Sequence, residues 1–262
     1  MDNRPIGIFD SGVGGLSILR EIKKLLPKEN FIFVADQKNM PYGHKTQKQI
    51  QSFSKEIMDF LTSKNVKAVV IACNTATVYA IDHLRSSYQI PVIGTVPVVG
   101  TIAKQSKTKK VAVFSTPGTA KSKYLKDLIK KFGNGTTIYK VGGKGLEELV
   151  EEGNLEDERI EKVLNKSLMP LLSKNVDAIA LGCTHYPFLR EKIQKIVGKN
   201  VLVLDSGEAV ARRVKEILEN NGILASKRDK DIYYTTGNPA KFKKVAETLL
   251  NRKLENFDYL AL

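Results

Sequence analysis

The sequence lacks the features of membrane-spanning, exported and disulfide-stabilised proteins. Only two of its 262 residues are cysteine, and a disulfide between them would be unusual in a reducing cytosol, so both are expected to be free thiols. The longest apolar-leaning stretch, residues 90–103, is broken by prolines and glycines and falls short of the roughly 20 residues that span a bilayer. The N-terminus lacks a basic region followed by an apolar one. These absences predict a cytoplasmic protein with no membrane partner.

Negative charge is also scarce relative to positive charge, and the formal net charge is +14. Such an excess favours anionic partners, either nucleic acids or small acidic molecules. The lysines are scattered, however, and no basic motif with interleaved aromatic residues is present. We therefore expect a solvated lysine-rich surface and no specific nucleic-acid partner. A nucleic-acid-binding protein is the alternative from another class, and its binding would weaken steeply with salt.

Short β-branched runs alternate with longer amphipathic segments, which is typical of parallel sheets covered by helices. Strands are expected at residues 6–9, 31–35, 68–72, 92–94, 111–115, 137–141, 178–181, 201–204 and 232–235. Helices are expected, among others, at residues 16–26, 47–63, 119–131, 160–173, 188–197 and 207–220. The pattern predicts an α/β protein.

A stretch of the sequence recurs, with both cysteines in the same place of the two copies. Residues 64–75 (KNVKAVVIACNT) align with residues 174–185 (KNVDAIALGCTH), so that Cys73 corresponds to Cys183. Residues 7–11 resemble 112–116, and residues 92–95 resemble 202–205, in the same order. These matches predict two pseudosymmetric lobes, each a mostly parallel sheet flanked by helices.

Each cysteine follows an expected buried strand and precedes small polar residues that begin a helix. Ligands bind at the carboxyl ends of the strands in such sheets, and a helix N-terminus there favours a thiolate or a carboxylate. If the lobes face each other, the thiols flank one site between them, as inversion of a stereocentre by proton transfer requires. A lone cysteine at a strand end is more often a small buried apolar residue; the matched positions favour catalysis. A metal site is not expected, because the two cysteines and His185 lack a fourth ligand and the close spacing of zinc sites.

Three other segments offer binding capacity. The glycine-rich run after Asp10 and Ser11 would let a ligand approach the backbone closely. Tyr42 and Gly43 follow Pro41 in what is either a simple turn or a binding turn. Thr116 and Thr119 follow the strand that matches the first strand, and their hydroxyls are suited to binding a carboxylate.

Seven motifs spread over nearly the whole chain resemble the bacterial glutamate racemases, within the aspartate/glutamate racemase family. They are GIFDSGVGGLS (7–17), ADQKNMPYGH (35–44), VIACNTAT (70–77), STPGTAKSKY (115–124), LGCTHYP (181–187), DSGEAVA (205–211) and YTTGNP (234–239). The resemblance implies a first lobe of residues 1–97 closed by residues 208–262 and a second lobe of residues 98–207. It also implies an isomerase that uses two thiols and no cofactor and supplies D-glutamate for peptidoglycan.

The resemblance assigns roles to individual residues. Cys73 would take the α-proton from D-glutamate and Cys183 from L-glutamate, with Asp10 and His185 placed to assist the thiols. The residues implied to bind glutamate are Asp10, Ser11, Tyr42, Gly43, Asn74, Thr75, Thr184 and His185. An aspartate racemase is the alternative within this class. The oligomeric state stays open, a homodimer included.

Overall fold

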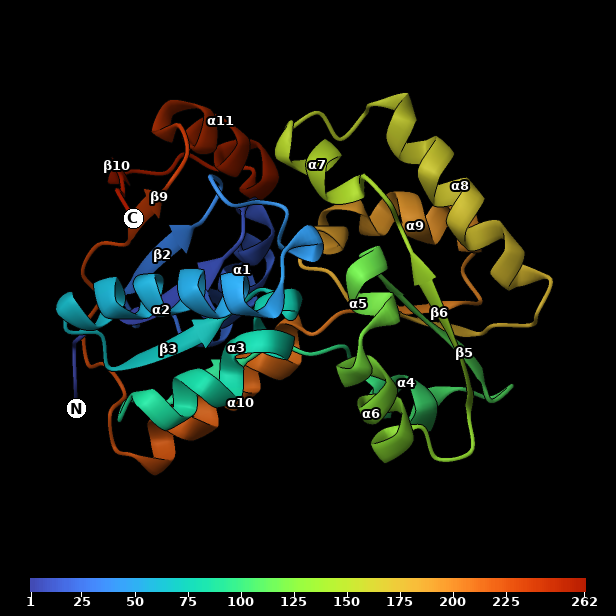
Figure 1. The fold of residues 1–262 in the computed structure, drawn as a ribbon, viewed down its shortest axis with the longest axis horizontal. Helices are drawn as coiled ribbons and strands as arrows, with labels where there is room; N and C mark the ends of the chain where they lie inside the picture. Colours follow the sequence, from blue (N-terminus) through green and yellow to red (C-terminus); the bar gives the residue numbers. More distant parts are fainter. The chain divides into compact units, whose positions relative to one another are not determined.

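The computed structural model describes all 262 residues, which divide into two compact units. The first unit comprises residues 1–95 and 207–262, and the second comprises residues 96–206. The chain therefore begins in the first unit, forms the second as a continuous insertion and returns to the first (Figure 1).

The first unit is built on a six-stranded parallel sheet with the order β10-β9-β2-β1-β3-β4. Its strands are β1 (Ile6–Asp10), β2 (Phe31–Ala35), β3 (Ala68–Ile71), β4 (Val92–Gly94), β9 (Ile232–Thr235) and β10 (Phe257–Tyr259). Its helices are α1 (Leu16–Leu25), α2 (Gln47–Ser63), α3 (Asn74–Ser87), α10 (Gly207–Asn220) and α11 (Pro239–Leu250), with short 3-10 helices η1 (Val13–Gly15) and η2 (Tyr42–His44).

Helices cover both faces of this sheet because its central strands are buried along their whole length. Phe9 and Ile71 join an apolar cluster with residues of α2 and α3 on one face. Phe33 stacks on Phe242 of α11, and α1 packs against α10. Side chains alternate between the faces of a strand, so each strand contributes to two cores.

The second unit contains a four-stranded parallel sheet with the order β6-β5-β7-β8. Its strands are β5 (Lys110–Ser115), β6 (Thr137–Gly142), β7 (Ala178–Leu181) and β8 (Leu202–Leu204). Its helices are α4 (Val99–Gln105), α5 (Pro117–Lys121), α6 (Lys123–Phe132), α7 (Leu146–Glu151), α8 (Glu158–Leu172) and α9 (Arg190–Val197), with η3 (Tyr186–Leu189) before α9. Residues of α4 and α6 pack on one face of the sheet, and Phe114 contacts Tyr186 of η3.

The repeat predicted from the sequence appears in the topology of the two sheets. The order β2-β1-β3-β4 in the first unit matches β6-β5-β7-β8 in the second. The pairing also matches, because Phe9 lies beside Ile71 and Phe114 lies beside Leu181. The predicted α/β fold with two similar parallel sheets is thus confirmed.

Two helical segments and one strand differ from the expectations. The helix expected over 119–131 is divided at Ser122, whose hydroxyl caps α6 by accepting a hydrogen bond from the Leu125 amide. The segment expected as one helix from 188 begins with the 3-10 helix η3. Strand β10 was not expected, because its three residues include Asp258 and carry no apolar run. No helix is both long and apolar enough to cross a membrane.

Candidate active site

Cys73 lies at the carboxyl edge of the first sheet, just beyond β3, where α3 begins. Its sulfur accepts a hydrogen bond from the Ala76 amide at 3.4 Å and so caps the helix. Only 5% of the residue is exposed. The chain folds this way locally because a buried apolar strand is followed by small residues that start a helix. The thiol thus lies at the N-terminus of α3, where a backbone amide donates a hydrogen bond to it.

Two residues at the carboxyl end of β1, Asp10 as its last residue and Ser11 just after it, lie near this thiol. The Ser11 hydroxyl lies 3.8 Å from the Cys73 sulfur. Asp10 is fully buried and accepts a hydrogen bond from the Gly15 amide at 2.5 Å. A Cβ on Gly15 would lie 2.7 Å from the Asp10 Cβ, so glycine is required for this approach. Asp10 and Ser11 thus lie beside the thiol.

The environment of Cys73 favours the protonated thiol at rest. Burial raises its pKa well above the usual value, and the negative charge of Asp10 raises it further. The hydrogen bonds from the Ala76 amide and Ser11 oppose this rise. A proton on the thiol is therefore strongly held, while donors that stabilise a thiolate are already in place.

Tyr42 lies in η2, which contacts α3, and its side chain belongs to the same apolar cluster as Cys73. Its hydroxyl donates a hydrogen bond to Asp36 at 2.6 Å. Burial and the Asp36 charge raise the pKa of Tyr42 well above its usual value, so the phenol stays protonated. Asp36 was not singled out from the sequence. Its position directly after the buried strand β2 is the feature by which the sequence could have indicated a site residue.

Asn74 is the first residue of α3 and is 4% exposed. Its side-chain oxygen and nitrogen form no hydrogen bond within the protein. Leaving a buried amide without partners is costly, so such a group points to a bound polar molecule. Thr75 beside it is buried as well. This pair is suited to binding the charged groups of an amino acid.

Cys183 occupies the equivalent place in the second unit, after β7, and is 7% exposed. Its sulfur lies 3.7 Å from Nδ1 of His185. The other ring nitrogen, Nε2, lies 2.8 Å from Oε1 of Glu151 on α7. The three side chains form a buried chain of thiol, imidazole and carboxylate. Glu151 was missed in the sequence, because no motif links it to a residue 34 positions further on.

His185 and Glu151 affect the protonation of the Cys183 thiol. Burial raises the pKa of Cys183, whereas the hydrogen bond and charge of His185 lower it. Burial lowers the pKa of His185, but the Cys183 thiol and Glu151 outweigh it and hold that pKa well above the usual value. A positively charged imidazole beside the sulfur favours a thiolate. Cys183 therefore has a partner that Cys73 lacks.

Gly43 follows Tyr42 within η2 of the first unit, and the other predicted residues lie in the second unit. Thr184 is buried next to Cys183. The Thr116 hydroxyl donates a hydrogen bond to the Thr119 hydroxyl at 3.1 Å and accepts one from the Thr119 amide, which caps α5. These two hydroxyls therefore have a local structural role. No group of three or more His, Cys, Asp and Glu side chains is arranged to hold a metal ion.

The fold and these thiol sites define a class of isomerase. A model of the family described as Asp/Glu/Hydantoin racemase matches residues 6–214. The glutamate racemase of Pediococcus pentosaceus is 40% identical over 97% of this chain and 97% of that protein. The chain belongs to this racemase family and, within it, to the glutamate racemases.

Solved structures agree with this assignment. The crystal structure of a glutamate racemase isoform from Bacillus anthracis superposes with a TM-score of 0.90 at 34% identity, covering 100% of this chain and 99% of that one. A glutamate racemase from Francisella tularensis, solved in complex with D-glutamate, gives a TM-score of 0.87 at 33% identity, covering 100% and 98%. The resemblance expected from the seven motifs is confirmed.

Proposed function

We propose that this protein interconverts L- and D-glutamate without a cofactor, with one thiol taking the α-proton and a second thiol donating a proton to the opposite face. The observation that carries the proposal is the repeat: Cys73 and Cys183 follow equivalent strands of two similar sheets. Each thiol is buried, and each has its own charged neighbour. A reaction between mirror-image substrates of equal free energy requires similar groups in both directions.

In the proposed mechanism the two thiols act on opposite faces of the α-carbon. Cys73 removes the α-proton from D-glutamate, and Cys183 donates a proton to the other face; from L-glutamate the roles are reversed. Ser11 and the Ala76 amide stabilise the Cys73 thiolate. His185, held by Glu151, stabilises that of Cys183.

Substrate binding is assigned to the polar residues around each thiol. In the first unit these are Asp10, Ser11, Tyr42, Gly43, Asn74 and Thr75, and in the second Thr184 and His185, with Thr116 and Thr119 as additional hydroxyls. The unpartnered amide of Asn74 supports this assignment most directly. Donors around the substrate carboxylate also stabilise the charge that develops when the α-proton leaves.

We place this activity in the cytoplasm, where a reducing environment keeps both thiols free. The D-glutamate formed would serve peptidoglycan synthesis. A homodimer stays a prediction, and the proton transfer proposed here does not depend on one.

Racemisation in heavy water tests the mechanism. Early product should carry a solvent-derived deuteron at the α-carbon, while recovered substrate stays largely unlabelled, because the second thiol delivers the new proton. Replacing either thiol, in Cys73→Ala or Cys183→Ala, should stop inversion in both directions. The remaining thiol should still exchange the α-proton of one enantiomer, D-glutamate for Cys73 and L-glutamate for Cys183.

Circular dichroism of the reaction and mass spectrometry of the α-position measure these outcomes. A folded Cys73→Ala or Cys183→Ala variant that racemises glutamate at nearly the wild-type rate would exclude the two-thiol mechanism. Activity should survive chelators and borohydride, since no metal or aldehyde cofactor takes part. The same assay with aspartate as substrate distinguishes a glutamate racemase from an aspartate racemase. If aspartate were inverted faster than glutamate, the proposed specificity for glutamate would be wrong.

A further inference from the structure

The motif at residues 234–239 packs against the segment that carries Tyr42, although it has no part in the proposed chemistry. Strand β9 runs parallel to β2, with Thr235 beside Ala35. The Thr236 amide donates a hydrogen bond to the Ala35 carbonyl at 3.0 Å. The C-terminal part of the chain thereby places Thr236 next to Asp36, at the carboxyl edge of the first sheet.

The Thr236 hydroxyl joins two groups of the loop after β2. It donates a hydrogen bond to Oδ1 of Asp36 at 2.8 Å and accepts one from the Lys38 amide at 3.0 Å. The Asp36 carboxylate is fully buried and also accepts hydrogen bonds from Tyr42 and from the Asn39 amide group. Thr236 is therefore one of three side chains that hold Asp36, and Asp36 in turn holds Tyr42.

The residues on either side of Thr236 also lie close to the loop after β2. The Thr235 hydroxyl lies 2.9 Å from the side-chain oxygen of Gln37. A Cβ on Gly237 would lie 3.0 Å from the Gln37 Cβ, which is tighter than ordinary contact. Glycine thus permits the close approach of the two segments, independently of the Thr236 hydroxyl.

We propose that Thr236 is a positioning residue for the turn at Tyr42 and Gly43, acting through Asp36. The proposal rests on the assignment of this turn to glutamate binding. Without the hydroxyl, the buried carboxylate loses a donor and the Lys38 amide loses its acceptor, so the turn is less well ordered before substrate arrives. Substrate binding then weakens, whereas proton transfer by the thiols is less affected.

The test compares Thr236→Val with Thr236→Ser, which keeps the hydroxyl. A matched control is Thr248→Val, since the Thr248 hydroxyl bonds only the Lys244 carbonyl on the exposed face of α11. In Thr236→Val the KM for both enantiomers should rise about tenfold, the size expected for a lost hydrogen bond to a charged group, with kcat within about threefold. Thr236→Ser and Thr248→Val should stay within about twofold of the wild type. If the valine variant does not fold, Thr236→Ala takes its place.

A double variant distinguishes action through Tyr42 from general loosening. If Thr236 acts through Asp36 and Tyr42, the rise in KM of Thr236→Val combined with Tyr42→Phe should be smaller than the product of the two single effects. Effects that simply multiply would exclude this route.

Hydrogen exchange without substrate tests positioning independently of catalysis. Amides of residues 38–46 should exchange faster in Thr236→Val than in the wild type, and those of the second unit should not change. If the wild type fails to racemise glutamate, the proposed function fails while this measurement still reports on the turn. Unchanged exchange at 38–46, an unchanged KM in a folded valine variant, or an equal defect in Thr236→Ser would overturn the proposal.

Discussion

At the scale of single residues, the two thiols occupy equivalent positions in different chemical environments. Cys73 lies beside the Asp10 carboxylate, which raises its pKa, whereas Cys183 lies beside His185, which lowers it. The equilibrium constant between enantiomers is one, so kcat/KM must be equal in the two directions whatever the difference between the bases. The asymmetry is therefore expected in kcat and in KM separately, and in the pH profile of kcat, whereas the pH profile of kcat/KM must be the same in both directions.

Glu151→Gln should reveal the part that the carboxylate takes in activating Cys183. Glu151 raises the pKa of His185, so its loss lowers that pKa, leaves less positive charge beside the sulfur and raises the pKa of Cys183. The alkaline shift in thiol ionisation should move the rising limb of kcat/KM to higher pH. At neutral pH kcat/KM should fall about tenfold or more, measured by circular dichroism across the pH range.

A neighbouring carboxylate provides the control for this prediction. Glu152 is half exposed and pairs with Arg159 at 2.5 Å. Glu152→Gln should therefore leave both the rate and the pH profile as in the wild type. An unshifted profile in Glu151→Gln would show that Glu151 does not control the thiol.

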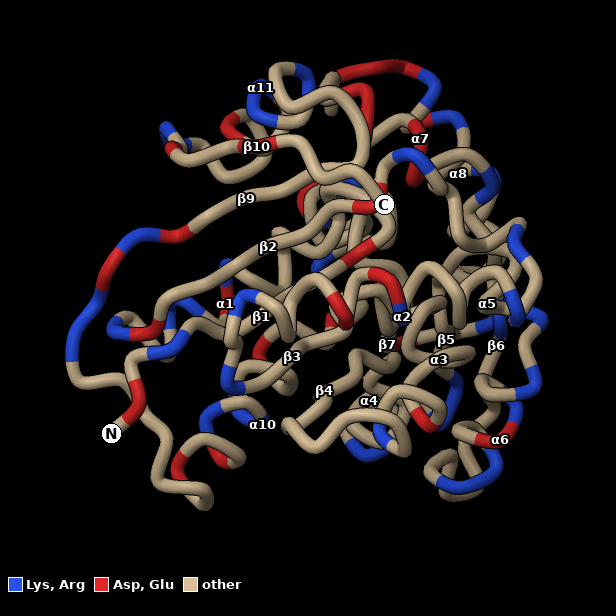
Figure 2. The backbone as a smooth tube through the Cα atoms, turned by 60° about the vertical axis from the view of Figure 1, so that its left-hand side comes forward, with Lys and Arg blue, Asp and Glu red and all other residues tan.

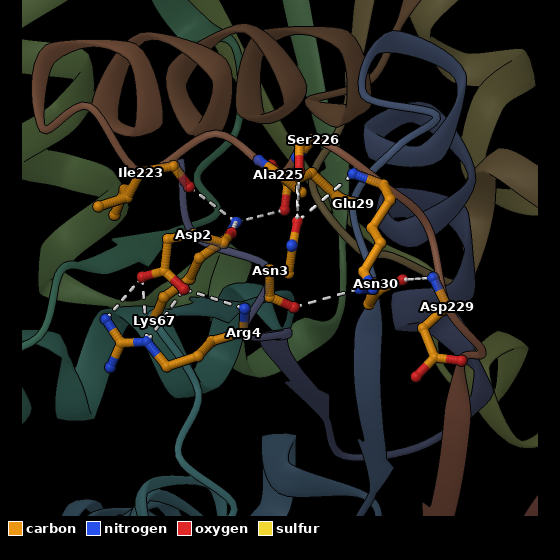
Figure 3. A network of polar contacts seen from close by, with 11 residues as sticks. Asp2, Asn3, Arg4, Glu29, Asn30, Lys67, Ile223, Ala225, Ser226 and Asp229 are labelled. Carbon is orange, nitrogen blue, oxygen red and sulfur yellow. Dashed lines mark hydrogen bonds and ion pairs between the residues drawn. The ribbon is translucent and has the colours of Figure 1, made fainter.

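At the scale of elements, the residue before the cysteine-bearing strand has opposite charge in the two copies of the repeat, and in both copies it bonds to neighbouring segments. Lys67, before β3, is fully buried and pairs with Glu29 at 2.6 Å. It also donates hydrogen bonds to the carbonyls of Asp2 and Ile223, which joins the chain start to the segment after α10 (Figure 3). At the equivalent position before β7, Asp177 accepts hydrogen bonds from Ser106 and from the amides of residues 107 and 108.

Lys67→Met should strongly destabilise the first unit. The substitution leaves Glu29 buried without its cation, which costs about 3–5 kcal/mol when one partner of a buried pair is removed. Urea unfolding followed by far-ultraviolet circular dichroism measures the loss. The double variant Lys67→Met with Glu29→Gln should recover part of it, because no unpaired charge then remains.

The exposed pair of Lys55 and Asp59 on α2 is the matched control. Lys55→Met should change the free energy of unfolding by less than about 0.5–1 kcal/mol, because exposed ion pairs contribute little. Equal effects of Lys55→Met and Lys67→Met would contradict the structural importance given to the buried pair.

At the scale of the whole molecule, basic residues are spread along both units with acidic residues among them (Figure 2). The net charge of +14 nevertheless remains large. Electrostatic attraction to anions acts over distances comparable to the Debye length, which is about 8 Å at physiological salt. Such a field attracts any polyanion without recognising a sequence.

Binding to duplex DNA should accordingly be weak, independent of sequence and steeply reduced by salt. Fluorescence anisotropy with two labelled duplexes of unrelated sequence, titrated at low and at physiological ionic strength, measures it. The two duplexes should bind alike at low salt and lose nearly all affinity at about 0.15 M salt. A tight complex that persists at physiological salt and prefers one sequence would point to a nucleic-acid function beyond the enzyme.

The sequence by itself determined the features that depend on neighbouring residues and on repetition. Apolar periodicity and short β-branched runs located nine strands close to their observed bounds. The repeated segment around Cys73 and Cys183 predicted two similar lobes, and the two sheets do share a strand order. Such features can be predicted from the sequence because the buried face of a helix or strand follows from the spacing of apolar residues within a short segment.

Only the tertiary structure decided which side chains support the predicted residues. Asp36 meets Thr236 across 200 positions of sequence, and Glu151 meets His185 across 34. Contacts of this kind arise when separate strands and helices bring their ends together at the edge of a sheet, and no local pattern records them. The division of the expected helix at Ser122 has a similar origin, because a serine inside an amphipathic pattern becomes a cap only when the preceding turn changes direction.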